Sequence, residues 1–366
     1  MRAMLPRRLA VGLAGGMLCL SLVPSVAAAE PTATVVASGL NNPRGIDVGV
    51  DGRVFFAETA TGKVRVIRNG VLGTLTSGLP FLTSPEGEST GVVNVSVRTG
   101  VGGAVAAVGG GPQNVDRRFD TVMRLSPRPG RIIANIQAYR NAHPDTTDLD
   151  QPPNPTDSNA YGIAALTGGR TLVTDAAGNE LDLIGPGGGI QTVAKFPNAV
   201  VSTSHLPPGI LPPFVTEIPA EAVPTSVAIG PDGWWYVSEL KGFPFTPGAS
   251  RIWRVSPSAR NVVCDPAATS GPCTVFATGL TSVTGIEFGP DGSLYAVEMI
   301  KNGVGNLFFG SSDLTGALIR IKGGVKTELV PGQITLGADV AVARNGTIYV
   351  TDHSVIPGAG RVLAIH

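Results

Sequence analysis

The sequence predicts an all-β protein, a six-bladed β-propeller built from four-stranded blades. Short apolar segments alternate with turn residues along the 366-residue chain, which contains 49 glycines and 30 prolines, and this spacing is typical of many short strands. One unit of strand, glycine turn and strand recurs six times. No long amphipathic segment interrupts these units, so a layer of helices is not expected.

The recurring unit is clearest in the stretches GVDGRVFFAET, GPDGWWYVSEL and GPDGSLYAVEM. A glycine in each turn supplies the positive φ that a tight hairpin requires. Successive turn glycines are 51 to 66 residues apart, a period that suits one propeller blade with its loops. The aligned turn glycines are Gly52, Gly103, Gly169, Gly233, Gly292 and Gly346.

Each unit continues into a third strand, and all but the last continue into a fourth. The last unit ends at His366 with the strand 361–365, whereas residues 32–37 form an apolar strand before the first unit. We therefore expect residues 32–37 to pair with residues 361–365 and close the ring, which leaves no open sheet edge. Three insertions between strands, residues 138–162, 196–224 and 240–250, are expected to be irregular loops that carry binding residues.

The first 29 residues predict a cleavable signal peptide. Arg2, Arg7 and Arg8 precede the apolar residues 9–23, and the alanines that end at Ala29 form a small-residue cleavage site. The apolar stretch is short for a membrane span and no second one follows, so membrane insertion is not expected. Residues 30–366 are therefore expected to be one secreted propeller domain.

Secretion also explains the cysteines. Only Cys264 and Cys273 follow the signal peptide, and in an oxidising compartment they are expected to form a disulfide. The 27 basic and 27 acidic side chains balance, so no net field favours nucleic acid as a partner.

The stretches LNNPRGIDVGVDGRVFFAE, DSNAYGIAAL and SELKGFPFTPGA resemble the ScyD/ScyE-like family of secreted proteins with an NHL/SMP-30-like six-bladed propeller. The resemblance extends over essentially the whole mature chain and implies this fold. The family is associated with pigment assembly, but the resemblance implies no particular activity, because a fold does not determine chemistry.

Five of the six units carry an acid at the end of the second strand, and Val108 is the exception. A residue that recurs in every blade is expected to serve the blade. We therefore expect these carboxylates to accept backbone N–H groups from the loop that follows. They are Glu58, Asp175, Glu239, Glu298 and Asp352.

The third residue of the innermost strand varies more. We align Asp47, Asn94 and Glu287 at this position, and the other three units have alanine there. Carboxylate and amide oxygens are ligands for a divalent cation such as Ca²⁺. Related SMP-30-like lactonases use a similar set, although their N-terminal glutamate motif is absent here. The alternative is a solvated polar channel without a metal.

A binding rim is predicted where loops meet the starts of the blades. Aromatic residues make up only 5% of the chain, so aromatic residues outside the strand pattern indicate a surface for a small molecule, a glycan or a protein. The alternative is a loop that plugs the disc. The predicted rim residues are Arg44, Asn159, Tyr161, Glu239, Lys241, Phe243 and Phe245.

The chain lacks the G-x-S-x-G elbow of serine hydrolases. The favoured hypothesis is therefore a secreted propeller that binds its ligand without catalysis. Two alternatives stay open: a metal-dependent SMP-30-like hydrolase or lactonase, and an accessory role in assembling an exported secondary metabolite.

Overall fold

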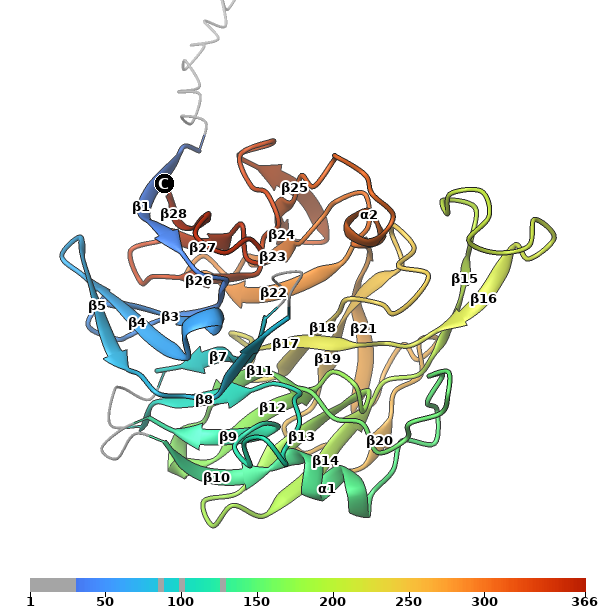
Figure 1. Cartoon of the computed structure of the whole chain (residues 1–366), viewed down its shortest axis with the longest axis horizontal. Helices are drawn as coiled ribbons and strands as arrows, with labels where there is room; N and C mark the ends of the chain where they lie inside the picture. The colour runs from blue at the N-terminus through green and yellow to red at the C-terminus, as the bar shows by residue number, and fades with distance from the viewer. Residues whose placement is uncertain (1–30, 85–88, 99–102, 126–129) are drawn as a thin grey trace, which may run out of the picture. The chain divides into compact units, whose positions relative to one another are not determined.

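The predicted six-bladed propeller is confirmed: six sheets, one for each sequence unit, surround a common axis (Figure 1). They are seen in a computed structural model that describes residues 31–366 except 85–88, 99–102 and 126–129. The predicted signal peptide, residues 1–29, lies outside the described residues.

Four antiparallel strands make up each blade, and the first strand of each lies innermost. The innermost strands are β2 (Pro43–Val48), β7 (Ser89–Ser96), β11 (Ala160–Ala165), β17 (Pro224–Ile229), β22 (Val283–Phe288) and β26 (Asp339–Val342). The second strands are β3 (Val54–Glu58), β8 (Val105–Val108), β12 (Thr171–Asp175), β18 (Trp235–Glu239), β23 (Leu294–Glu298) and β27 (Ile348–Asp352). The third strands are β4 (Lys63–Arg68), β9 (Thr121–Arg124), β13 (Glu180–Ile184), β19 (Ser250–Val255), β24 (Ala317–Lys322) and β28 (Gly360–Ile365). The outermost strands are β5 (Val71–Thr76), β10 (Arg131–Asn135), β14 (Ile190–Lys195), β21 (Cys273–Leu280), β25 (Val325–Leu329) and β1 (Ala33–Leu40).

The ring closes as the sequence predicted. Strand β1 pairs antiparallel with β28, from Ala33 opposite Ile365 to Leu40 opposite Gly360. The first strand of the propeller thereby completes the blade formed by the last residues of the chain. Closure satisfies the backbone groups along an edge of β28 that would otherwise stand open.

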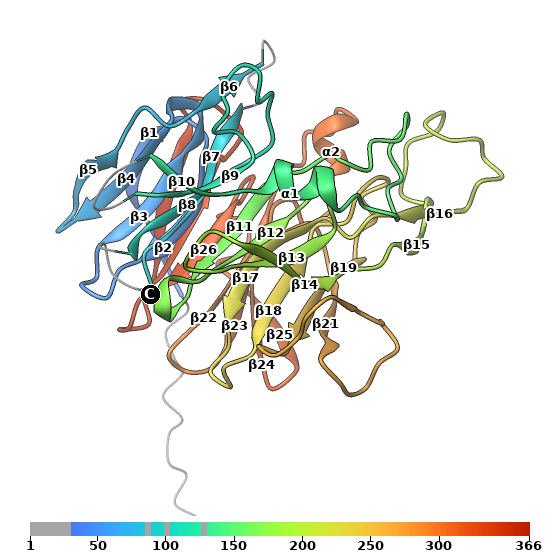
Figure 2. The same ribbon diagram turned by 90° about the horizontal axis from the view of Figure 1, so that it is seen from below.

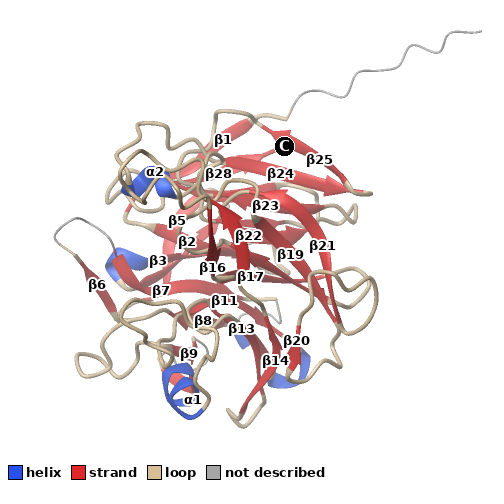
Figure 3. Ribbon diagram, turned by 90° about the vertical axis from the view of Figure 1, so that its right-hand side faces the viewer, coloured by secondary structure: helices blue, strands red, loops and turns tan. Residues whose placement is uncertain are grey.

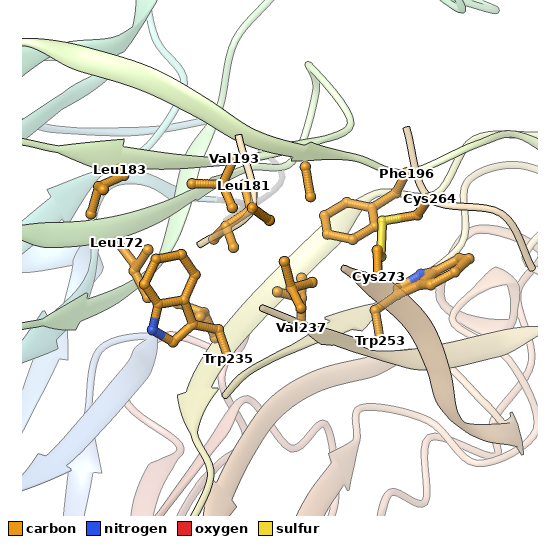
Figure 4. Close-up of a cluster of buried hydrophobic side chains, with 14 of the residues drawn as sticks. Leu172, Leu181, Leu183, Val193, Phe196, Trp235, Val237, Trp253, Cys264 and Cys273 are labelled. Atoms are coloured by element: carbon orange, nitrogen blue, oxygen red, sulfur yellow. A yellow bond between two sulfur atoms is a disulfide. The ribbon is translucent and has the colours of Figure 1, made fainter. Parts of the chain in front are cut away.

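The hydrophobic core lies between neighbouring blades. Between blades 3 and 4, Leu172 and Leu181 lie in one cluster with Trp235 and Trp253 (Figure 4). The predicted disulfide is confirmed within this cluster, where Cys264 and Cys273 are bonded with a Cα–Cα distance of 5.3 Å. Alternation along each strand places one set of side chains against each neighbouring blade.

Two insertions contain regular structure that the sequence analysis did not anticipate. Helix α1 (Ile136–Ala142) begins two residues before the first insertion and forms its start. Its buried Arg140 forms ion pairs with Asp175 at 3.1 Å and with Glu180 at 2.5 Å. The second contains a projecting hairpin of β15 (Ala199–Ser202) and β16 (Glu217–Ala220), visible in Figure 1. The remaining strands and α-helix of the described residues are short: β6 (Phe81–Thr83), β20 (Val262–Val263) and α2 (Gly305–Phe308).

The two sides of the disc differ. Helix α2 and strand β6 lie on one side of the blades, and the turn between β24 and β25 lies on the opposite side (Figures 2 and 3). We call these the α2 face and the opposite face. Within the described residues, every helix is too short or too polar to cross a bilayer.

Candidate functional site

A cavity of about 220 Å³ opens on the α2 face, where the innermost strands begin. Four of the predicted rim residues line it: Arg44, Asn159, Tyr161 and Phe245. Five blades contribute to its walls, because these residues come from blades 1, 3 and 4 and the other lining residues add blades 5 and 6. The mouth of the channel is therefore a shared concave site of the kind that usually binds small molecules.

The other three predicted rim residues lie outside this cavity. Glu239 and Lys241 are buried and form an ion pair at 2.7 Å, while Glu239 also accepts a hydrogen bond from Trp253 Nε1 at 2.5 Å. Burial raises the pKa of Glu239 and lowers that of Lys241. Phe243 is 42% exposed, and its ring centre lies 6.1 Å from that of Phe245. The pair Glu239–Lys241 fixes the loop, and Phe245 at its end reaches the cavity.

Residues after β23 complete the cavity, and the sequence analysis missed them. Met299, Val304, Leu307 and Phe308 form the apolar wall of blade 5. The Phe308 ring stacks on Phe245 with centres 5.5 Å apart and an interplanar angle of 25°. The signal was present in the non-repetitive stretch KNGVGNLFFGSSD, which interrupts the blade pattern and carries two adjacent phenylalanines.

Threonines near the blade starts also line the cavity, but their hydroxyl groups serve the ring. Thr225 Oγ1 donates to the Val283 carbonyl at 2.7 Å, and Thr284 Oγ1 donates to the Gly337 carbonyl at 3.3 Å. Each bond links one blade to the next. These hydroxyls therefore hold the cavity walls together and have no proton to spare for a ligand.

Arg44 brings to the cavity a guanidinium whose hydrogen-bonding capacity is not fully used. Its Nη2 donates to the Ser89 carbonyl at 3.1 Å, but its buried Nε has no hydrogen-bond partner among the described residues. No aspartate or glutamate among the described residues lines the cavity. Arg44 is half-buried, lines the cavity and has no ion pair among the described residues, so its charge is open to a partner from outside the chain.

The opposite end of the channel holds two of the three predicted metal residues, Asp47 and Glu287, and Arg98 lies beside them. Glu287 forms an ion pair with Arg98, which raises the pKa of Arg98 above its ordinary value. Asp47 accepts hydrogen bonds from the backbone N–H groups of Val48 and Val97, both at 2.7 Å. Burial raises the pKa of Asp47. Both carboxylates are thus engaged by groups of the protein.

Asn94 does not lie level with Asp47 and Glu287, and the alignment that placed it there is wrong. In blades 4 and 5 the bulge of the inner strand is followed by the pairs Ser226–Ser238 and Gly285–Val297. In blade 2 the first pair after the bulge is Asn94–Ala107, so Asn94 is the counterpart of Ser226 and Gly285. Ser96, two residues later, is the true counterpart of Glu287. The error arose because the stretch between Ser96 and Val105 is longer in sequence than the stretch between Val48 and Val54 in blade 1.

At its own level Asn94 contacts Asp339, a residue that the sequence analysis missed. Asn94 Nδ2 donates to Asp339 Oδ2 at 3.4 Å, and the Ile46 N–H donates to the same oxygen at 3.0 Å. Burial raises the pKa of Asp339 to about 8. The sequence did indicate that Asp339 is unusual, because the equivalent residues in blades 1, 3 and 5 are Gly45, Gly162 and Gly285. Across the described residues, no group of three or more His, Cys, Asp or Glu side chains is arranged to hold a metal ion.

The recurrent acids of the second strands have a structural role, with a different backbone partner from the one predicted. Glu58, Asp175 and Glu298 accept N–H bonds from Asn41, Asn159 and Thr281, at 3.0, 2.8 and 2.7 Å. These donors precede the innermost strand, whereas the prediction placed them in the loop after the acid. Asp175 alone of the three also accepts a bond from that following loop, from Gly178 at 3.0 Å. These three acids therefore fix the chain where it enters blades 1, 3 and 5, whereas Glu239 pairs with Lys241 and Asp352 pairs with Arg361.

Comparison with known proteins supports the fold. No family profile matches the sequence, and no curated protein matches it. Among solved structures, a PQQ-bound aldose sugar dehydrogenase from Streptomyces coelicolor is 14% identical with a TM-score of 0.54, over 93% of this chain and 99% of that one. A streptogramin B lyase is 14% identical with a TM-score of 0.50, over 92% and 97%. A putative gluconolactonase is 11% identical with a TM-score of 0.47, over 93% of each chain. At these identities the likeness to the dehydrogenase and the lyase establishes the β-propeller architecture alone, since one fold serves many chemistries.

Proposed function

We propose that the protein is an exported β-propeller that binds a small organic molecule in the cavity of the α2 face, without catalysing its conversion. The observation that carries this proposal is the cavity itself, in which walls from five blades surround the underused guanidinium of Arg44. A volume of about 220 Å³ suits a small molecule better than a glycan chain or a protein segment.

The composition of the walls favours binding over catalysis. Among the described lining residues there is no histidine, cysteine, aspartate or glutamate, so no general base adjoins a nucleophile there. The Ser354 hydroxyl donates to the Leu336 carbonyl at 2.8 Å. His353 and Asp352 precede it in the chain, but neither lines the cavity.

Export and family membership belong to the same proposal. The signal-peptide pattern of residues 1–29 and the disulfide both support export. The sequence resemblance supports placement in the ScyD/ScyE-like family. N-terminal sequencing of protein recovered from the culture medium should begin at Glu30, and recovery of the intact N-terminus from the cytoplasm would contradict export.

Affinity selection of small molecules tests the binding site. The protein is incubated with a small-molecule extract of its source, separated by gel filtration, and analysed for retained compounds by mass spectrometry. Val355 lines the cavity, whereas its neighbour Ile356 is 39% exposed and does not. Val355→Trp should abolish retention and Ile356→Trp should preserve it. Equal retention by both variants, or none by the wild type, would refute a binding site in this cavity.

A further inference from the structure

We propose that the ligand of this cavity is a small amphipathic carboxylate, with its anionic group on Arg44 and its apolar or aromatic body against Phe245 and Phe308. The inference rests on the proposed function and names the chemical class that the same site selects.

The charge of the ligand follows from Arg44. It is the one cationic side chain among the described residues that line the cavity, and no acidic side chain accompanies it. Its Nε is buried and lacks an acceptor. A guanidinium presents its N–H groups in a fork that matches a carboxylate. One cation also matches one negative charge, so a polyphosphate is disfavoured.

The apolar part of the ligand follows from the wall of blade 5. Phe308 is 60% exposed although it stacks on Phe245, and Leu307 and Met299 extend the apolar surface into the cavity. Large exposed apolar groups at the rim of a cavity mark a surface that a ligand covers. A ring or short aliphatic chain would remove this surface from water.

The two features lie on different blades, which makes the site directional. Arg44 belongs to β2 of blade 1, and Phe308 belongs to α2 in the insertion of blade 5. Blade 6 separates them around the ring, and its residues Ala338 and Val355 form the apolar wall between them. A molecule that carries its charge at one end and its apolar body at the other satisfies both features at once.

Phenylacetate is a suitable probe, with phenylacetamide and benzylamine as matched neutral and cationic compounds. Titration calorimetry and saturation-transfer NMR should show that phenylacetate binds at least about tenfold more tightly than phenylacetamide, because charge-assisted hydrogen bonds are worth about 1.5–3 kcal/mol. Benzylamine should not bind. Arg44→Gln should remove the preference for the acid over the amide, and Phe308→Ala should weaken both about equally.

Arg131→Gln provides the control, since Arg131 is exposed on β10 and does not line the cavity; it should bind phenylacetate as the wild type does. Equal binding of acid and amide, or an unchanged preference in Arg44→Gln, would overturn the carboxylate inference while the cavity remained a binding site. If affinity selection retains a compound in the wild type and in Ile356→Trp but not in Val355→Trp, and that compound is not an anion, the inference is also overturned. Failure of the proposed function differs from both results, because in the affinity selection the wild type would then retain no compound, or Val355→Trp and Ile356→Trp would retain compounds equally.

Discussion

Glu298 and Glu58 occupy equivalent positions in two blades, but replacing them with glutamine should have opposite effects on stability. Each ends the second strand and accepts a backbone N–H bond from the chain before the innermost strand. Glu58 also contacts Arg65 at 2.7 Å. Glu298 has no ion pair among the described residues and is 7% exposed. The two sites therefore differ chiefly in whether the charge is neutralised.

The pKa values express this difference. Burial raises the pKa of Glu298 from 4.5 to about 7. The buried Glu298 carboxyl therefore does not lower the free energy of unfolding below pH 4.5. It lowers this free energy progressively as the pH rises from 4.5 to 7, and by a constant amount above pH 7. The full cost corresponds to about 3 kcal/mol. Burial also opposes ionisation of Glu58, but the Asn41 N–H and the Arg65 guanidinium outweigh it and hold the pKa of Glu58 below its ordinary value.

Glu298→Gln keeps the oxygen that accepts the Thr281 N–H and removes the ionisation cost. The new amide N–H group needs a partner, which costs about 1 kcal/mol. The variant should therefore be about 2 kcal/mol more stable than the wild type at pH 8 and about 1 kcal/mol less stable at pH 4.5. For a propeller of this length the gain at pH 8 corresponds to a Tm about 3 °C higher.

Glu58→Gln should show the reverse. Its loss of the Arg65 partner should cost about 1–2 kcal/mol at pH 8. This loss should shrink only as the pH falls from 4.5 through the lowered pKa of folded Glu58. Urea unfolding of both variants at pH 4.5 and 8 measures how the change in unfolding free energy depends on pH. The cost of the new amide group is the same at both pH values, so it cancels from this comparison. If Glu298→Gln gains no stability between the two pH values, or if both variants respond alike, the assignment of an unpaired buried carboxylate to blade 5 is wrong.

Three further predictions concern the ring, the disulfide and the channel. Deletion of residues 31–40 should leave β28 with an open edge and produce aggregates in gel filtration; a monomer of unchanged Tm would show that β1 does not close the ring in solution. Replacement of Cys264 and Cys273 together by serine should lower the free energy of unfolding by about 2–3 kcal/mol, and urea unfolding that matches the wild type would contradict this. Ca²⁺ or EDTA should change the Tm by less than about 1 °C, because Asp47 and Glu287 are already engaged; a larger Ca²⁺ shift that Asp47→Ala removes would support a metal site instead.

The fold was predictable because its signals are local. Each hairpin carries its own turn glycine and each strand its own alternation, so six similar units could be found without knowledge of their contacts. Blade 2 is the instructive failure. It has Val108 in place of the recurrent acid, and the stretch between its first two strands is longer in sequence. Because neither the acid nor the spacing could fix the alignment, Asn94 was aligned two residues away from its true level. The repeat predicted the strand but not its register.

The cavity was predictable only in part, because it depends on contacts between distant segments. Arg44, Asn159 and Tyr161 precede or begin repeated strands, so the repeat located them. Phe308 lies in an insertion that no other blade repeats, and only the closed ring brings it to the same mouth as Arg44. Lys241 was predicted to lie at the rim, but it does not line the cavity, because its charge is satisfied by the neighbouring Glu239. Composition alone does not reveal this pairing.

The two ends of the channel differ in a way that favours the α2 face as the proposed binding site. At the opposite face Arg98 is paired with Glu287, so the cation and the anion there neutralise each other. At the α2 face Arg44 has no such partner among the described residues. The loop of Phe245 and the insertion of Phe308 both reach the α2 face, and they add apolar walls beside the unpaired guanidinium. An anionic ligand at this mouth gains a charge partner and an apolar surface together. At the other mouth it would first have to displace Glu287 from Arg98, so the asymmetry of the channel selects the α2 face.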